Sequence, residues 1–181
     1  LNETAQQLGA STQFSATQAA EAMSYLGMAG WKTDQIIAGM PGMLDLAAAS
    51  GSDLATVADI VSDDLTAFGM SADQAGHMAD VMAAASTNAN TNVEMMGMTF
   101  KYAGAVAGAL GYSLEDVSIA TGLMANAGIK ADQAGTSLRA IMTRLIDPPK
   151  DAATALDALG ISAVNADGSV KPFRQTIMEL R

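Results

Sequence analysis

The chain has 181 residues, of which half are hydrophobic and 15% are charged, so its composition excludes an intrinsically disordered protein. The formal net charge of −10 argues against a nucleic-acid surface and against docking on anionic lipid, because both need clustered Lys and Arg. The absence of cysteine excludes disulfides, thiolate catalysis and zinc sites with cysteine ligands.

The side chains available for a core favour packed helices over a sheet. Only 4% of the residues are aromatic, whereas 13 are Met, a flexible side chain that fills irregular gaps. We therefore predict an all-α fold, a compact multi-helix domain of short helices joined by turns that contain glycine. No stretch reaches the roughly 18 uncharged apolar residues that a membrane-spanning helix needs.

Capping residues and helix breakers divide the first part of the chain. The first helix is predicted to end at Gly9, and Ser15 with Gln18 forms a capping box that begins the second. The third is expected to begin at Thr33 and to break or kink near Pro41. Later helices are predicted to begin at three residues with capping side chains: Ser52, Ser71 and Thr91. The helix after Thr91 is rich in glycine, which would let another backbone approach closely: Gly97, Gly104 and Gly108.

One junction formula recurs: a glycine that closes a helix, an apolar residue, then a polar or capping residue. It occurs at five places: Gly30-Trp31-Lys32, Gly69-Met70-Ser71, Gly111-Tyr112-Ser113, Gly128-Ile129-Lys130 and Gly160-Ile161-Ser162. Residues 69–76 (GMSADQAG) and 128–135 (GIKADQAG) are nearly the same. A common helix-closing turn or an old duplication would explain this, and we favour the turn because the flanking sequences diverge.

The stretch Gly128–Pro149 contains the best-defined helix. It should begin near Ala131, and an apolar stripe places the small residues of AGTSLR (134–139) on a packing surface. After it we expect a short helix, a small β-hairpin near residues 161–171 and a further helix that begins at Pro172. Residues 1–149 are predicted to form a helical core, with residues 150–181 continuous with it.

The ends of the chain suggest a piece of a longer protein. It begins with Leu rather than Met, and it ends in what is expected to be the middle of a helix.

The titratable residues form no convincing site. His77 lies near Asp73 and Asp80, but a lone histidine is weak evidence for a metal site. The carboxylates of one helix are interpreted as a solvated acidic face with a first-turn Asp: Asp53, Asp59, Asp63 and Asp64. Asn165–Ser169 resembles part of a calcium loop but lacks the acidic first and twelfth ligands, so we interpret it as a turn. We predict no catalytic, cofactor-binding or metal-binding residue, no cofactor, and no enzyme activity.

A helix-turn-helix is the main alternative that the residues themselves offer. Leu123–Ile141 places an Ala three residues before a Gly, followed by a second helix, which is the spacing of such DNA-binding motifs. The acidic chain and the few cations of the second helix argue against it.

The whole chain resembles the conserved domain of phage tail tape measure proteins of the TP901 minor tail type. The residues that carry the resemblance include AGTSLRAIMTRLIDPP and lie in six stretches, in order: Leu8–Trp31, Leu44–Met70, Met78–Met96, Ala107–Ile129, Ala134–Pro149 and Leu159–Phe173. The resemblance implies a structural virion protein that sets tail length, templates the tail tube and leaves ahead of the DNA.

The expected location is the lumen of the virion tail, and the host cytoplasm during assembly. The expected partners are copies of the chain and other tail proteins (tail tube, chaperone and tip), with no small-molecule substrate and no specific nucleic acid. A membrane-active segment, in contact with lipid only during ejection, is the second hypothesis, and an enzyme is the third.

Overall fold

A computed structural model describes all residues 1–181, and all of its regular secondary structure is helical. The prediction of an all-α fold is therefore confirmed. The helices are α1 (Asn2–Ser11), α2 (Ala16–Met28), α3 (Thr33–Ser50), α4 (Leu54–Phe68), α5 (Ala75–Asn88), α6 (Val93–Leu110), α7 (Leu114–Asn126), α8 (Ala131–Ile146), α9 (Lys150–Leu159) and α10 (Phe173–Glu179), with a 3₁₀ turn η1 (Ala72–Gln74) before α5.

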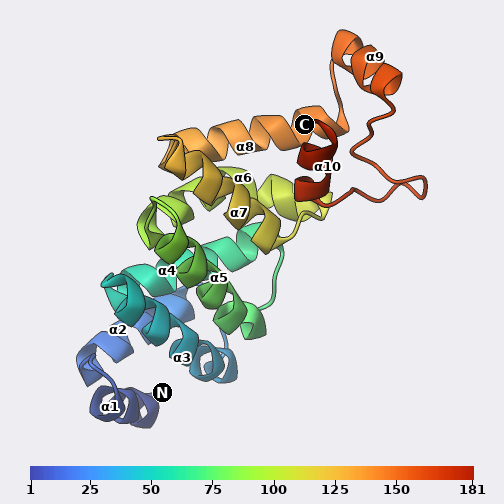
Figure 1. Ribbon diagram of the computed structural model, residues 1–181. Helices are drawn as coiled ribbons and strands as arrows, with labels where there is room; N and C mark the ends of the chain where they lie inside the picture. Colours follow the sequence, from blue (N-terminus) through green and yellow to red (C-terminus); the bar gives the residue numbers. More distant parts are fainter.

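Alternate helices pack side by side and form two rows. One row runs α2, α4, α6 and α8, and the other runs α3, α5 and α7, with α10 beside α7. The chain thus climbs from α1 at the bottom of Figure 1 to α8 at the top. The accessible surface of 9385 Å² exceeds the roughly 8,200 Å² expected for a compact protein of this mass. The domain is a stack rather than a sphere, and α9 projects from it without a buried residue.

The glycine junctions do what the sequence predicts. All five junction glycines have φ between 67° and 88°, a left-handed conformation that glycine adopts without a steric penalty. The apolar residue after each glycine donates its N–H to the carbonyl five residues earlier, at 2.8–3.0 Å. These are Schellman closures, which satisfy carbonyls left free at the helix end.

Close backbone approach between alternate helices depends on small residues. A Cβ atom on Gly135 of α8 would lie 2.5 Å from the carbonyl oxygen of Thr99 in α6. A Cβ atom on Gly42 of α3 would lie 2.8 Å from the Cα atom of Gly76 in α5. The near-identical segments 69–76 and 128–135 each lead into a helix that packs on the helix two before it. Only Gly135 needs to be glycine at this contact, because a Cβ atom on Gly76 would have no atom within 4 Å. The predicted packing surface at AGTSLR is confirmed.

Helix ends differ from the predictions at several points. Helix α1 continues through Gly9 to Ser11, because Gly9 lies against the backbone of Ala16 instead of closing the helix. Helix α3 continues through Pro41, which lies on the exposed side, where water can solvate the carbonyl that proline leaves unpaired.

The side chains of Asp53 and Asn92 cap α4 and α6, in place of the predicted Ser52 and Thr91. The predicted capping box of Ser15 and the expected starts at Thr33 and Ala131 are confirmed.

The predicted β-hairpin is wrong. Residues 161–171 contain a single antiparallel bridge, between Val164 and Val170, and no strand. The segments that flank this bridge are too short to form strands, because Pro172 lies only two residues after Val170 and has no N–H group to donate.

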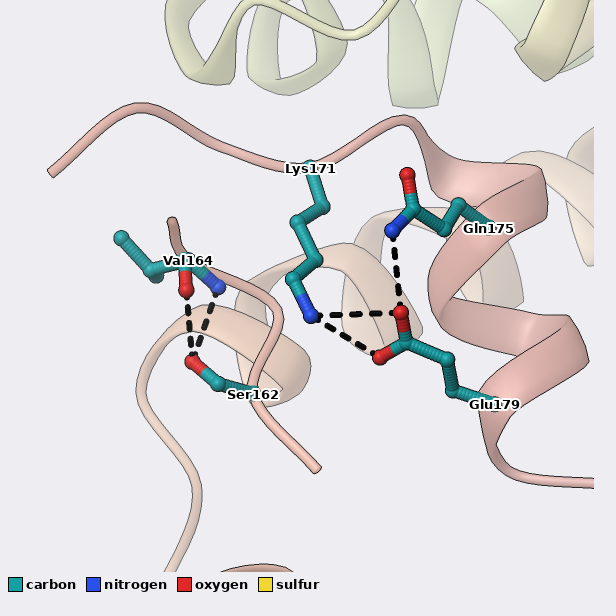
Figure 2. A network of polar contacts seen from close by, with 5 residues as sticks. All are labelled: Ser162, Val164, Lys171, Gln175 and Glu179. Carbon is teal, nitrogen blue, oxygen red and sulfur yellow. Dashed lines mark hydrogen bonds and ion pairs between the residues drawn. The ribbon is translucent and has the colours of Figure 1, made fainter. Parts of the chain in front are cut away.

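Polar contacts tie this segment to α10 instead of extending a sheet. The Lys171 ammonium lies 2.9 and 3.2 Å from the two carboxylate oxygens of Glu179, and Gln175 donates a hydrogen bond to the same carboxylate (Figure 2). The hydrogen bond from Gln175 and then the contact with Lys171 lower the pKa of Glu179.

Helix α10 is fixed to α7 at its first turn. The carboxylate of Asp116, a residue that is 6% exposed, accepts a hydrogen bond from the backbone N–H of Arg174 at 3.3 Å. A carboxylate at this place also interacts favourably with the dipole of α10. Tyr112 and Phe173 pack edge to face beside it, with ring centroids 5.4 Å apart.

The substitution Gly135→Ala should lower the free energy of unfolding by about 1–3 kcal/mol, because the added methyl group would collide with backbone that cannot move freely. The matched control is Gly27→Ala in α2, where no atom lies within 4 Å of the added Cβ atom. That change should be neutral or should stabilise by about 0.5–1 kcal/mol. Urea denaturation measures both, and unchanged stability of Gly135→Ala would contradict the close packing of α8 on α6.

Candidate interaction surfaces

An apolar groove lies between α5 and α7 in the second row. It encloses about 360 Å³, and small residues that include Ala84, Ala85 and Gly122 line it. A Cβ atom on Gly122 would lie 3.1 Å from that of Ala89, so the two helices nearly touch at this point. Two large side chains beside the groove are exposed, Ile119 by 43% and Leu123 by 66%. Such an apolar surface is suited to contact with a helix of another protein.

Polar contacts bridge the two sides of the groove at its ends. At one end, His77 Nε2 lies 2.8 Å from Glu115 Oε1, and both side chains are about half exposed. At the other end, the Asn90 N–H donates a hydrogen bond to Asn126 Oδ1 at 2.8 Å. His77 thus links α5 to α7, and the structure contains no group of three or more His, Asp or Glu residues that could hold a metal ion.

A second, acidic pocket lies between α4 and α6 in the first row. It encloses about 470 Å³. The charged residues that line it are four carboxylates and one ammonium: Asp59, Asp63, Asp64, Glu94 and Lys101. No ion pair joins Lys101 to any of these carboxylates. The pocket therefore carries an excess of negative charge.

Asp64 corrects the interpretation of α4 as carrying a solvated acidic face. Asp59 and Asp63 are exposed as expected, but Asp64 is only 2% exposed, and its Oδ2 atom has no hydrogen-bond partner. Burial, and secondly the charge of Asp63, raise the pKa of the Asp64 carboxyl well above its ordinary value. The sequence did contain a signal, because Asp64 lies three residues after Val61 and four before Phe68, on the buried stripe.

The glycines of α6 explain why a carboxyl group is buried there. Gly97 lies against Ile60, and Gly104 lies against Ala67, so α6 approaches α4 about one turn before and one turn after Asp64. Each contact is tight, since a Cβ atom on either glycine would lie within 3.0 Å of its neighbour. Asp64 is enclosed between these two contacts.

The remaining sequence hypotheses gain no support from the geometry. Helix α8, the candidate recognition helix, buries Ala134, Gly135, Leu138 and Met142. Its most extensive contact is with α6, so it serves as a packing element of the stack. No helix combines the length and apolar character needed to cross a membrane. The segment Asn165–Ser169 is a turn, in which Asp167 accepts hydrogen bonds from Ser169.

These features define a class of protein, an all-α stack of alternating helices with an apolar groove and an acidic pocket on its surface. The chain belongs to the phage-related minor tail protein family, whose family model matches residues 2–181.

Two curated relatives are similar over almost the whole chain. The tape measure protein of Pneumococcus phage Dp-1 is 43% identical over 174 residues, which cover 96% of this chain and 15% of the relative. The probable tape measure protein of Escherichia phage P2 is 30% identical over 181 residues, which cover 100% of this chain and 22% of the relative. The chain therefore spans less than a quarter of either relative. No solved structure matches the chain.

The burial of Asp64 predicts a specific dependence of stability on pH. In the unfolded chain its pKa should be about 3.9. Between that value and its raised pKa, the folded state keeps a proton that the unfolded state has lost. The contribution of this carboxyl to stability therefore falls as pH rises through this window and stays lost above it.

The substitution Asp64→Asn keeps the shape and removes the titration. The unfolding free energy of the variant relative to the wild type should rise from about pH 4 upward, by about 1.4 kcal/mol for each unit of raised pKa, and then level off. Urea denaturation across a pH series measures it, with Asp45→Asn, an exposed site on α3, as the control. A difference that stays constant with pH for Asp64→Asn would show that Asp64 titrates normally.

Proposed function

We propose that this domain is a structural and assembly module of a phage tail tape measure protein, and that it takes part in tail length determination, tube assembly and genome ejection. The observation that carries the proposal is similarity to two proteins named as tape measure proteins, along 96% and 100% of the chain. The domain acts by contact rather than by catalysis, in the tail lumen of the virion and in the host cytoplasm during assembly.

The geometry supports a contact role more than a ruler role for this segment. A single helix of 181 residues would extend about 270 Å at 1.5 Å per residue. This chain instead folds back at each junction glycine into two rows of short helices. We propose that the part of the full protein that measures length lies outside this segment, and that this segment makes defined contacts.

The proposed contacts are with copies of the chain and with other tail proteins, namely the tube, the chaperone or the tip. The groove between α5 and α7 is the favoured surface, because it combines small residues at the helix contact with two exposed aliphatic side chains, Ile119 and Leu123. Burial of both side chains against a partner would contribute roughly 1.5–3 kcal/mol each, which suffices to direct assembly when many copies are present.

The double substitution Ile119→Asp and Leu123→Asp in the full-length protein tests this proposal. Both sites are exposed, so the domain should keep its thermal stability, while charges in the groove should prevent partner docking. The expected result is at least a tenfold decrease in the number of complete tails counted by electron microscopy. The matched control is Met28→Asp, a 72% exposed site on α2 that does not line this groove, and it should assemble normally. Normal tails from the double variant would contradict the proposed role of the groove in partner docking.

A further inference from the structure

The acidic pocket between α4 and α6 contains a polar group that the fold leaves without a partner. Asp64 lines the pocket, and its Oδ2 atom is buried with no hydrogen bond. An unpartnered buried carboxyl destabilises a fold whether it is protonated or ionised, because it gives up hydration without a replacement. A side chain that reached this carboxyl from outside would supply the missing interaction.

The surroundings of Asp64 favour a cation. Asp59, Asp63 and Glu94 line the same pocket, and Lys101 is the only positive group among its lining residues. The chain as a whole carries a formal charge of −10, which raises the local concentration of cations further. Lys101 forms no ion pair with Asp64, so the position is not satisfied from within the chain.

The arrangement of the carboxylates favours an organic cation over a metal ion. No three acidic or histidine side chains converge as metal ligands, so a calcium or magnesium ion would find too few oxygen atoms from the protein. The walls also contain aliphatic and small groups, among them Ile60, Ala67 and Met98. Lysine and arginine combine an aliphatic stem with a terminal charge, which matches a pocket lined by both apolar groups and carboxylates.

We propose that the α4–α6 pocket binds a lysine or arginine side chain from a basic segment of a protein partner, with the Asp64 carboxylate as its ion-pair acceptor. This inference goes beyond the proposed function, because it rests on Asp64 and its pocket and not on similarity to tape measure proteins. The tight contacts of Gly97 and Gly104 with α4 lie one turn before and one turn after Asp64, so both ends of the pocket are formed by closely packed helices. The partner's cation gains a charge-assisted hydrogen bond, which is stronger than a neutral one.

The test uses small probes that mimic the two side chains, n-butylammonium and n-butylguanidinium. Each is titrated into the 181-residue chain at constant ionic strength while NMR follows the Asp64 carboxyl carbon and the amides of residues that line the pocket. Tetramethylammonium, which cannot donate a hydrogen bond, is the control probe. We expect saturable shifts at Asp64 with at least one of the first two probes and none with tetramethylammonium.

Two variants with equal net charge separate a specific site from general attraction. Asp64→Asn and the exposed control Asp45→Asn each remove one negative charge. Asp64→Asn should weaken probe binding at least tenfold, and Asp45→Asn less than twofold. Urea denaturation at the pH of the titration checks that Asp64→Asn is folded, so that lost binding is separated from unfolding.

Four outcomes would overturn the proposal: no saturable shift with either organic probe, equal loss in the two variants, shifts with tetramethylammonium, or calcium chloride that binds at Asp64 and displaces the organic probes. None of them would affect the tail-assembly proposal, which is tested at the α5–α7 groove. Normal assembly with the groove variant, which would contradict the proposed role of the groove, would equally leave the cation pocket in place.

Discussion

The close approach of alternate helices through small residues is the constraint on which the rest of the structure depends. Gly135 lies against the Thr99 carbonyl, and Gly42 lies against Gly76, at distances that leave no room for a Cβ atom. Gly108 makes a third such contact, with the backbone of Phe68. Backbones this close exclude water and bring many atoms into contact, although each glycine weakens its own helix by up to about 1 kcal/mol. A chain with only 4% aromatic residues can therefore build a continuous core, because Met and Leu fill the spaces that these contacts leave.

The same constraint produces both candidate contact surfaces. Where α6 approaches α4 through Gly97 and Gly104, the helix surfaces enclose Asp64 and leave an acidic pocket. In the second row, α7 approaches α5 at Gly122, and this contact lies in a groove beside the exposed side chains of Ile119 and Leu123. Both surfaces thus lie between neighbouring helices of one row, in a stack whose short helices are joined by hydrogen-bonded glycine closures.

Much of the local structure could be predicted because helix caps, helix-closing turns and apolar stripes depend on residues close together in the sequence. The five junction glycines, the Ser15 capping box and the apolar stripe of α8 each depend on residues within a few positions of each other. The wrong predictions depended on distant contacts or on solvent. Gly9 has the sequence pattern of a helix stop, but a glycine is needed there because the first residue of α2, Ala16, lies against it. Pro41 looked like a breaker, but it lies on the wet side of α3. Asp64 is predicted to be exposed because it is charged, although its position lies on the buried side of α4. The close approach of α6 explains why it is buried. The pairing of alternate helices, and with it both surfaces, could not be read from one sequence.

The most direct test of the two-row architecture is a nuclear Overhauser measurement between α-protons of residues in alternate helices. Strong cross-peaks are expected between the α-protons of Gly42 and Gly76, and between those of Gly135 and Thr99, since these backbones are in van der Waals contact. Both should appear in the folded chain and vanish together on unfolding. A folded, helical protein that lacks both cross-peaks would show that alternate helices do not pack in this way, and it would contradict the two-row architecture from which the groove and the pocket derive.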